Sequence, residues 1–224
     1  MITTVDVETS WQVTSTGGYD PSPFHPDNIL VSVGINDEYY FTNHSERIDK
    51  GCYHNIQSVL DKTTLLIGHN IKFDLMWLLE SGFKYSGRVY DTMLGEYILN
   101  RGIRKSLTLE MSCRRRRIGS KDSRIKEFTD RGIPFQNIPV GLVEEYGRMD
   151  VQITRYLFDS QMADFKMPKN KHLLKTAKMM NEFLVVLSDM ERNGINVNLD
   201  ELSKVEREYR AEFAYLKQKI DKIV

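Results

Sequence analysis

The sequence predicts a mixed α/β fold, in which helices cover both faces of a central sheet and a C-terminal helical segment follows. Two observations lead to this prediction. Short β-branched and aromatic runs come first and then alternate with helical patterns, which is typical of a sheet with helical crossovers. From residue 167 onward, long patterns carry apolar residues three and four apart, as helices do. With 41% hydrophobic residues, the 224-residue chain can form a substantial core.

The N-terminal part of the chain predicts strands separated by turns. Residues 2–9 are rich in Ile, Thr and Val, which favours a strand. The next segment, 10–28, is polar and contains three prolines and two adjacent glycines, so we expect a long loop. The apolar runs 29–35 and 39–42 then predict a hairpin that turns at 36–38.

Strands and helices alternate in the next part of the chain. A short helix is expected at 56–60, and the compact apolar run 65–68 predicts a buried parallel strand. A helical pattern at 71–80 follows directly. The run 88–90 predicts another short strand, and 92–99 predicts the helix after it. This alternation is the pattern expected of parallel strands connected by helices.

The rest of the chain predicts helices only. Hydrophobic periodicity is weak at 101–131, where charged residues dominate, and no element is predicted there. A helix is expected from Pro139 to about residue 162, because its apolar residues recur at helical spacing. Two further helices, 173–190 and 202–223, flank a turn at Asn193 and Gly194.

Two acidic residues share one face of the first predicted strand. Side chains two apart in a strand point to the same side, so Asp6 and Glu8 project together while Val5 and Val7 point into the core. Two neighbouring carboxylates repel each other unless a cation lies between them, and Mg²⁺ or Mn²⁺ prefers such oxygen ligands. An exposed acidic strand end is the alternative interpretation of this motif alone.

Two further pairs of residues have the i, i+4 spacing that places side chains on one helix face. Asn70 and Asp74 form the first pair, and an aspartate near a helix start is also ordinary dipole chemistry. Tyr146 and Asp150 form the second pair, for which a core tyrosine above a solvated aspartate is the alternative. Each motif is weak alone. Their occurrence in a fixed order, each on the element that its geometry requires, indicates one shared acidic site.

This order of motifs resembles that of the DEDD exonucleases, which have a ribonuclease H-like fold. The tyrosine variant of that family is indicated, because Tyr146 stands four residues before Asp150 and Glu145 occupies the position of the other variant's histidine. The segments 90–99 (YDTMLGEYIL) and 190–197 (MERNGINV) are similar to proofreading domains of family A, polymerase I-type DNA polymerases. The loop DPSPFHPDN resembles that of phage-type members of the family.

The resemblance implies a fold, an organisation and an activity. We expect a ribonuclease H-like 3′→5′ exonuclease domain at 1–166, followed at 167–224 by a helical connector and the truncated start of a polymerase domain. The expected reaction removes the 3′-terminal nucleotide from single-stranded or frayed DNA with two divalent cations, Mg²⁺ or Mn²⁺, as the proofreading part of a DNA polymerase. The expected partners are the 3′ end of single-stranded DNA and the polymerase domain of the same full-length chain.

The resemblance also implies roles for individual residues. Asp6, Glu8 and Asp150 would hold the ion that activates water, and Asp6 would bridge to a second ion that Asp74 supports. Tyr146 would orient the attacking water, because a phenol with a pKa of about 10 is a poor base near neutral pH.

Further residues are candidates for binding the substrate or supporting the site. Thr9 and Asn70 are candidates for contacting the terminal nucleotide, and we expect Asp91 to cap the helix that begins at Thr92. A basic run could contact the DNA backbone or be an ordinary solvated surface; it comprises Arg114, Arg115, Arg116 and Arg117.

Two other functions compete with this interpretation. A ribonuclease D-type exoribonuclease would share the four carboxylates, and a non-catalytic DNA-binding module would not use them. The segment 190–197 argues against the first alternative, and the intact carboxylates argue against the second. The sequence contains no apolar run of transmembrane length, and Cys52 and Cys113 form no ligand pair, so we expect a cytoplasmic protein with reduced thiols, in the host cytoplasm if it is phage-encoded.

Overall fold

The computed structural model describes residues 1–119 and 124–222. The chain forms two compact units, Met1–Asp189 and Met190–Val224, and each is described by itself. The first unit therefore extends beyond residue 166, the expected end of the exonuclease domain, and the functional boundary stays a prediction. Within the described residues, no helix has both the length and the apolar character needed to cross a membrane.

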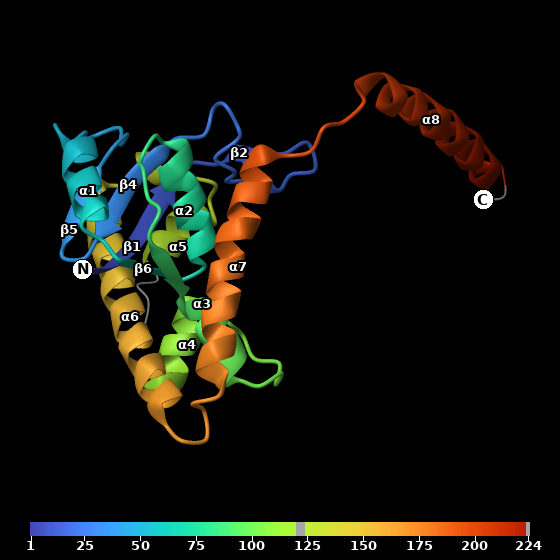
Figure 1. Cartoon of the computed structure of the whole chain (residues 1–224). Coiled ribbons are helices and arrows are strands. Elements are labelled where there is room, and N and C mark those ends of the chain that lie inside the picture. Colours follow the sequence, from blue (N-terminus) through green and yellow to red (C-terminus); the bar gives the residue numbers. More distant parts are fainter. Residues whose placement is uncertain (120–123, 223–224) are drawn as a thin grey trace. The chain divides into compact units, whose positions relative to one another are not determined.

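The first unit is built on a five-stranded mixed sheet (Figure 1). Its strands are β1 (Ile2–Thr9), β4 (Leu30–Ile35), β5 (Glu38–Phe41), β6 (Leu65–Gly68) and β7 (Arg88–Asp91). They lie in the order β5-β4-β1-β6-β7. β4 is antiparallel to β1 and β5, whereas β6 is parallel to β1 and β7 is parallel to β6. The predicted mixed sheet is confirmed.

The alternation of side chains along β1 divides the interior into two layers. Val5 and Val7 are buried in a core to which α1 (Cys52–Asp61) and α2 (Ile71–Glu80) contribute. The opposite face of the sheet carries Asp6 and its cross-strand partner Gly34. A Cβ added at Gly34 would meet Val151 of α6, so α6 (Val140–Lys166) covers that face.

Shorter elements surround these layers. They are the hairpin of β2 (Gln12–Val13) and β3 (Tyr19–Asp20), the helices α3 (Thr92–Leu99), α4 (Leu109–Arg116) and α5 (Arg124–Thr129), and a 3₁₀ turn at Phe135–Asn137. The hairpin, α4, α5 and the 3₁₀ turn were not expected. The helices α4 and α5 bury few side chains, chiefly Leu109 and Cys113 in α4 and Ile125 in α5. Because both segments are short and rich in charged residues, neither shows a clear apolar period in the sequence.

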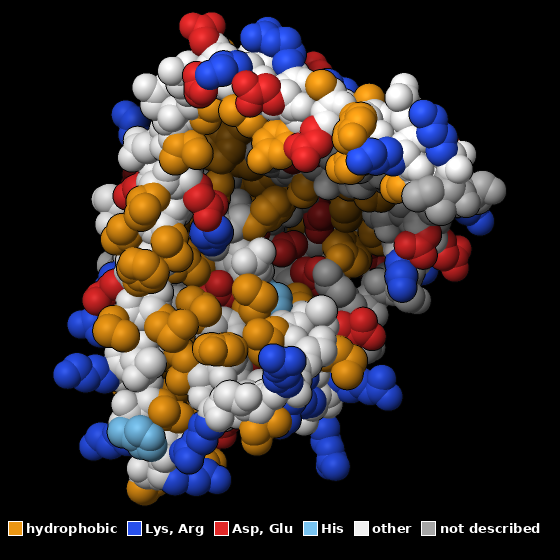
Figure 2. Space-filling view, turned by 90° about the vertical axis from the view of Figure 1, so that its right-hand side faces the viewer, with side chains coloured by type: hydrophobic (Ala, Val, Ile, Leu, Met, Phe, Trp, Pro, Cys, Tyr) orange, Lys and Arg blue, Asp and Glu red, His pale blue; other side chains and the backbone are white. Residues whose placement is uncertain are grey.

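The last helices are longer than predicted. α7 (Leu173–Asn193), most of which belongs to the first unit, buries a narrow face that includes Ala177, Asn181 and Leu184. Other side chains of this helix are exposed, among them Met179, Phe183 and Val186. Figure 2 shows hydrophobic side chains gathered over the side of the molecule on which α7 lies in Figure 1.

The second unit contains α8 (Leu199–Asp221), which begins at a cap formed by Asn198. The side chain of Asn198 accepts hydrogen bonds from the backbone N–H groups of Asp200 and Glu201. None of the described side chains of α8 is buried. The predicted apolar stripe along it consists of Leu202, Val205, Tyr209, Phe213, Leu216, Ile220 and Ile223, of which Ile223 lies outside the described residues.

Candidate active site

The site begins on β1, where Asp6 and Glu8 project from the same face. Asp6 is half-buried and Glu8 is buried. Their partners on β4 are Gly34 and Ser32. The register of the β1–β4 pairing shifts between Glu8 and Thr9, directly after the second carboxylate.

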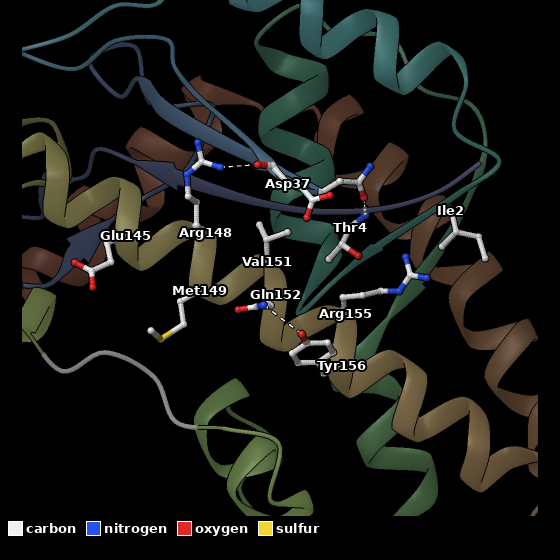
Figure 3. A pocket seen from close by; sticks show the side chains of 11 residues that line it. Ile2, Thr4, Asp37, Glu145, Arg148, Met149, Val151, Gln152, Arg155 and Tyr156 are labelled. Carbon is white, nitrogen blue, oxygen red and sulfur yellow. Dashed lines mark hydrogen bonds between the residues drawn. The ribbon is translucent and has the colours of Figure 1, made fainter.

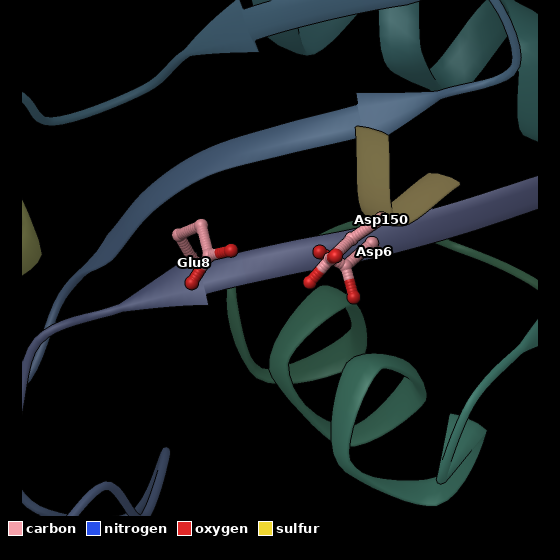
Figure 4. A group of neighbouring side chains, drawn as sticks. All are labelled: Asp6, Glu8 and Asp150. Atoms are coloured by element: carbon pink, nitrogen blue, oxygen red, sulfur yellow. The ribbon is translucent and has the colours of Figure 1, made fainter. Parts of the chain in front are cut away.

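Asp150 on α6 completes a compact acidic cluster with these two residues. Atoms of the three carboxylates, one oxygen from each, lie within 4.8 Å of one another. Figure 4 shows Asp6 and Glu8 on β1 and Asp150 reaching them from the helix. Because Glu8 and Asp150 are buried, three carboxylates at this spacing repel one another when ionised, and a bound cation would offset that repulsion. The oxygen donors suit a hard divalent ion such as Mg²⁺ or Mn²⁺.

Asp74 approaches the cluster from the other side of β1. It is buried in the first turn of α2, and its Oδ1 accepts a hydrogen bond of 2.9 Å from the backbone N–H of Val7. Burial, followed by the negative charge of Asp6, raises the pKa of Asp74 well above its ordinary value. Asp74 is not in the group of three that lies within 4.8 Å, but it is close enough to interact electrostatically with Asp6.

Tyr146 lies one helical turn before Asp150 and is half-buried beside the cluster. Burial raises the pKa of the Tyr146 phenol, and the charges of Glu8, Asp150 and Asp6 raise it further. The phenol hydroxyl donates a hydrogen bond to Asp150. The group therefore stays protonated near neutral pH, where it can donate a hydrogen bond but cannot act as a base.

Asn70 and Asp91 form the support at the start of α2. Asn70 adopts a left-handed backbone conformation, and its exposed position leaves the side chain accessible. Its backbone N–H donates to Oδ1 of Asp91 at 2.9 Å, and the same carboxylate accepts from the backbone N–H of Met93. Asp91 is thus the predicted cap of α3. Thr9, the other candidate for contacting the nucleotide, is buried at the end of β1.

The four arginines of the basic run have different environments in the structure. Arg115 and Arg116 both form ion pairs with the buried Glu96 of α3, at 3.1 and 2.5 Å. Arg116 also pairs with Asp164 of α6 at 2.7 Å. These two guanidinium groups therefore connect α4 to its neighbours, while Arg114 and Arg117 are exposed. The role of Glu96 could not be predicted from local spacing, because it lies about twenty residues before its partners in the chain.

His69, beside the site, also has a role that was not predicted. His69 precedes Asn70, and its ring is held between the hydroxyl of Thr92 and the carbonyl of Leu107, both at 2.9 Å. The histidine thus connects the start of α2 to the segment before α4. The only sequence signal for it was its position next to Asn70.

A separate groove of about 650 Å³ runs along the flank of α6 (Figure 3). It is lined by residues of β1, of the turn between β4 and β5, and of α6, among them Thr4, Asp37 and Arg155. Arg148 donates a hydrogen bond to the carbonyl of Asp37 at one end of the groove. None of the four carboxylates of the acidic site lines it.

Solved structures identify the class of fold. The structure of Brucella melitensis NrnC bound to pGG matches with a TM-score of 0.64 at 19% identity, over 86% of this chain and 85% of that one. The catalytic core of RRP6 from Trypanosoma brucei matches with a TM-score of 0.55 at 12% identity, over 82% and 45% of the chains. These matches identify the fold class as ribonuclease H-like.

The sequence identifies the family. The model of a family described as 3′-5′ exonuclease matches residues 19–163, more than half of the chain, and the chain belongs to this family. The match includes Asp74, Tyr146 and Asp150 and begins after Asp6 and Glu8. Two curated relatives are DNA polymerase I from Borreliella burgdorferi, 26% identical over 65% of this chain, and from Chloroflexus aurantiacus, 27% identical over 68%. The aligned residues make up 15% and 16% of those relatives.

Proposed function

We propose that the chain removes 3′-terminal nucleotides from single-stranded or frayed DNA, as the proofreading part of a DNA polymerase. The observation that carries the proposal is the cluster of Asp6, Glu8 and Asp150 in a chain of the 3′-5′ exonuclease family. Asp74 adds a fourth buried carboxylate beside Asp6. A non-catalytic module would have no use for buried acidic groups whose mutual repulsion destabilises the fold.

The proposed site holds two divalent cations, Mg²⁺ or Mn²⁺. Asp6, Glu8 and Asp150 would hold one of these ions, and Asp6 and Asp74 would hold the other. When bound, such ions lower the pKa of water and stabilise the charge that develops on the attacking and leaving oxygens of a phosphodiester. A solved structure of NrnC is described with bound Mg²⁺, which supports a divalent ion in this fold.

The other residues of the proposed site orient the reactants. The protonated hydroxyl of Tyr146 can fix the position of the attacking water from beside Asp150. Asn70 presents an exposed amide at the start of α2, and Thr9 ends the strand that carries the cluster. Among the basic residues, Arg114 and Arg117 are exposed and suit phosphate contacts, whereas Arg115 and Arg116 act mainly by holding α4.

DNA is favoured over RNA by the curated relatives, which are both DNA polymerases. Because the aligned part is about one sixth of each relative or less, we propose that a polymerase domain of a longer chain is the natural partner. We further propose a cytoplasmic location, in the host cytoplasm if the gene is carried by a phage. An exoribonuclease of the ribonuclease D type is the second candidate, favoured by the fold shared with RRP6.

One experiment separates these functions. DNA and RNA oligonucleotides of the same sequence, labelled at the 5′ end, are incubated with the purified chain in Mg²⁺, in Mn²⁺ or with a chelator. We expect a ladder of products shortened from the 3′ end of single-stranded DNA, and no cleavage with the chelator. Faster degradation of RNA would favour the second candidate. No cleavage of either substrate in any metal would overturn the proposed activity.

A further inference from the structure

Tyr39 of β5 lies in the same row of the sheet as Asp6. Gly34 is the direct partner of Asp6 on one side and of Tyr39 on the other, so all three positions face α6. The Tyr39 side chain is 4% exposed, and its hydroxyl lies 2.8 Å from Oγ of Ser32. Ser32 is in turn the partner of Glu8 on β1. The tyrosine ring thus extends across β4 toward both carboxylates of the strand.

Gly34 provides the space beneath this ring. A Cβ at Gly34 would lie 3.2 Å from Cδ2 and Cε2 of Tyr39, which is closer than ordinary packing allows, and 2.7 Å from Cγ2 of Val151. The lack of a side chain at this position therefore allows the ring to pack closely on the backbone of β4. The same absence lets α6 approach the sheet at Val151.

Gly147 provides the space above the ring. It is next to Tyr146 and three residues before Asp150 in α6. A Cβ at Gly147 would lie 2.7 Å from Cζ of Tyr39 and closer still to Cε2 and the hydroxyl. Glycine inside a helix costs about 1 kcal/mol relative to alanine. A steric requirement at the contact with Tyr39 explains its presence here.

The ring has little freedom to avoid such a contact. It is enclosed by Gly34 on one side and Gly147 on the other, and it packs edge-to-face on Phe41 at 5.3 Å. Its hydroxyl is engaged with Ser32. A methyl group at residue 147 would therefore displace α6 rather than the tyrosine.

We propose that Tyr39 is a positioning residue, whose ring, held between Gly34 and Gly147, sets the distance of α6 from the sheet and thereby brings Asp150 to Asp6 and Glu8. The inference rests on the proposed function, in which these carboxylates hold a divalent cation. It adds a requirement outside the acidic motifs: the helix that carries the third ligand is placed by a tyrosine on a different strand.

Two glycines of α6 allow a matched test. Gly141 lies in the same helix, and a Cβ there would meet nothing within 4 Å. We expect Gly141→Ala to leave the Mn²⁺ concentration for half-maximal binding unchanged. Gly147→Ala is expected to raise that concentration about 10- to 100-fold, the usual effect of disturbing the support of metal ligands. Binding is measured by calorimetry below the melting temperature of each variant, and cleavage is measured in parallel, with partial recovery expected at high Mn²⁺.

A second substitution tests whether the effect passes through Tyr39. Tyr39→Leu removes the outer ring atoms that a methyl group at residue 147 would meet. In the Tyr39→Leu background, Gly147→Ala should raise the Mn²⁺ concentration for half-maximal binding by a factor at least three times smaller than in the wild type. Equal costs in the two backgrounds would overturn the proposal, and so would identical behaviour of Gly147→Ala and Gly141→Ala. If Gly147→Ala does not fold, Tyr39→Leu alone decides: a raised midpoint supports the proposal and an unchanged midpoint overturns it.

The wild type separates this inference from the function on which it rests. Suppose that the wild type binds Mn²⁺ and cleaves DNA, but the variants give one of the contradicting outcomes named above. Only the role of Tyr39 is then refuted. If the wild type neither binds Mn²⁺ nor cleaves, both the proposed function and the inference are overturned. Binding without cleavage would refute the activity alone, because the calorimetric comparison of the variants still tests the role of Tyr39.

Discussion

At the scale of single residues, the acidic site combines two ways of accommodating buried charge. Asp6, Glu8 and Asp150 lie together, in an arrangement whose mutual repulsion a bound cation would relieve. Asp74 instead accepts a hydrogen bond from the backbone N–H of Val7, and its pKa is raised by burial and by Asp6. Because ions bind the folded chain in preference to the unfolded chain, metal binding and stability are linked.

The first prediction concerns the double variant Asp6→Ala with Glu8→Ala. Cleavage of single-stranded DNA should fall to background, because two ligands of the proposed cation are lost. In a chelator the melting temperature should equal or exceed that of the wild type; relief of about 1 kcal/mol of repulsion corresponds to roughly 2–4 °C. Added Mn²⁺ should stabilise the wild type more than the variant. Cleavage near the wild-type rate would show that the site is wrongly assigned.

The second prediction separates Tyr146 from Asp150. If Tyr146 only orients water, Tyr146→Phe should lower the cleavage rate by roughly 10²-fold or less. Its pH profile between pH 6 and 9 should keep the wild-type shape, because the phenol, with its raised pKa, remains protonated throughout this range. Asp150→Ala should lose far more activity, since it removes a metal ligand. Equal losses in the two variants, measured in single-turnover assays, would contradict this division of roles.

Local periodicity was sufficient to predict some of these residues but not others. The pairing of Asp6 with Glu8 follows from strand alternation, and that of Tyr146 with Asp150 follows from helical spacing. The bond from Val7 to Asp74 could not be predicted, because it depends on how closely α2 approaches β1. The contacts of Tyr39 with Gly34 and Gly147 could not be predicted either, because tertiary packing brings α6 onto the sheet at this point.

At the scale of elements, α4 is held by charge as well as by apolar packing, because Leu109 and Cys113 pack on α6 while its arginines form ion pairs. The side chain of Glu96 is 3% exposed, and it receives ion pairs from Arg115 and Arg116. A buried carboxylate left without its partners is strongly destabilising. This explains how a segment with three successive arginines, Arg114 to Arg116, can be helical without a clear apolar period. Such a network could not be predicted from sequence, because it depends on α3, α4 and α6 meeting in space.

The third prediction divides the arginine run into two pairs. Arg115→Ser with Arg116→Ser should lower the free energy of unfolding by about 3 kcal/mol, because Glu96 loses both ion-pair partners and keeps, among the described residues, only the hydrogen bond from Gln161. Arg114→Ser with Arg117→Ser should leave the free energy of unfolding nearly unchanged. That pair should instead weaken single-strand binding and reduce its salt slope by about 0.7 log unit per lost phosphate contact. Urea denaturation and binding titrations at several salt concentrations distinguish the two effects. An unchanged salt slope of binding would mean that none of the four arginines contacts phosphate.

At the scale of the whole molecule, the strands and long helices of the first unit were largely predictable, and the C-terminal part was predictable only as helices. Alternation and apolar runs identified β1, β4 and β6, and helical spacing identified α2 and α6. How far the nuclease extends along the chain is not encoded in such patterns. It depends on contacts such as that of Asn181 in α7, whose Oδ1 accepts a hydrogen bond of 2.6 Å from the backbone N–H of Asp91.

The fourth prediction concerns this extent. The proposed active-site residues all belong to the first unit, and α8 buries none of its described side chains. Deletion of residues 199–224 should therefore leave cleavage of single-stranded DNA and the melting temperature of the nuclease essentially unchanged. Truncation after residue 166 should be different, because it removes Asn181 and the core residue Leu184; a buried leucine alone is worth about 2–5 kcal/mol. Thermal melting and nuclease assays of both truncations provide the comparison.

The same truncations test the proposed relation to a polymerase. The aligned residues amount to about one sixth of each DNA polymerase I relative or less, so we expect neither residues 1–224 nor the shorter forms to extend a primer with nucleotides present. The apolar stripe of α8 would then need a covering surface from a longer chain or from another copy, and the deletion should also remove any tendency to associate at high concentration. Primer extension by residues 1–224, or complete loss of cleavage on deleting 199–224, would refute the division into a self-sufficient nuclease and a helix belonging to the polymerase side.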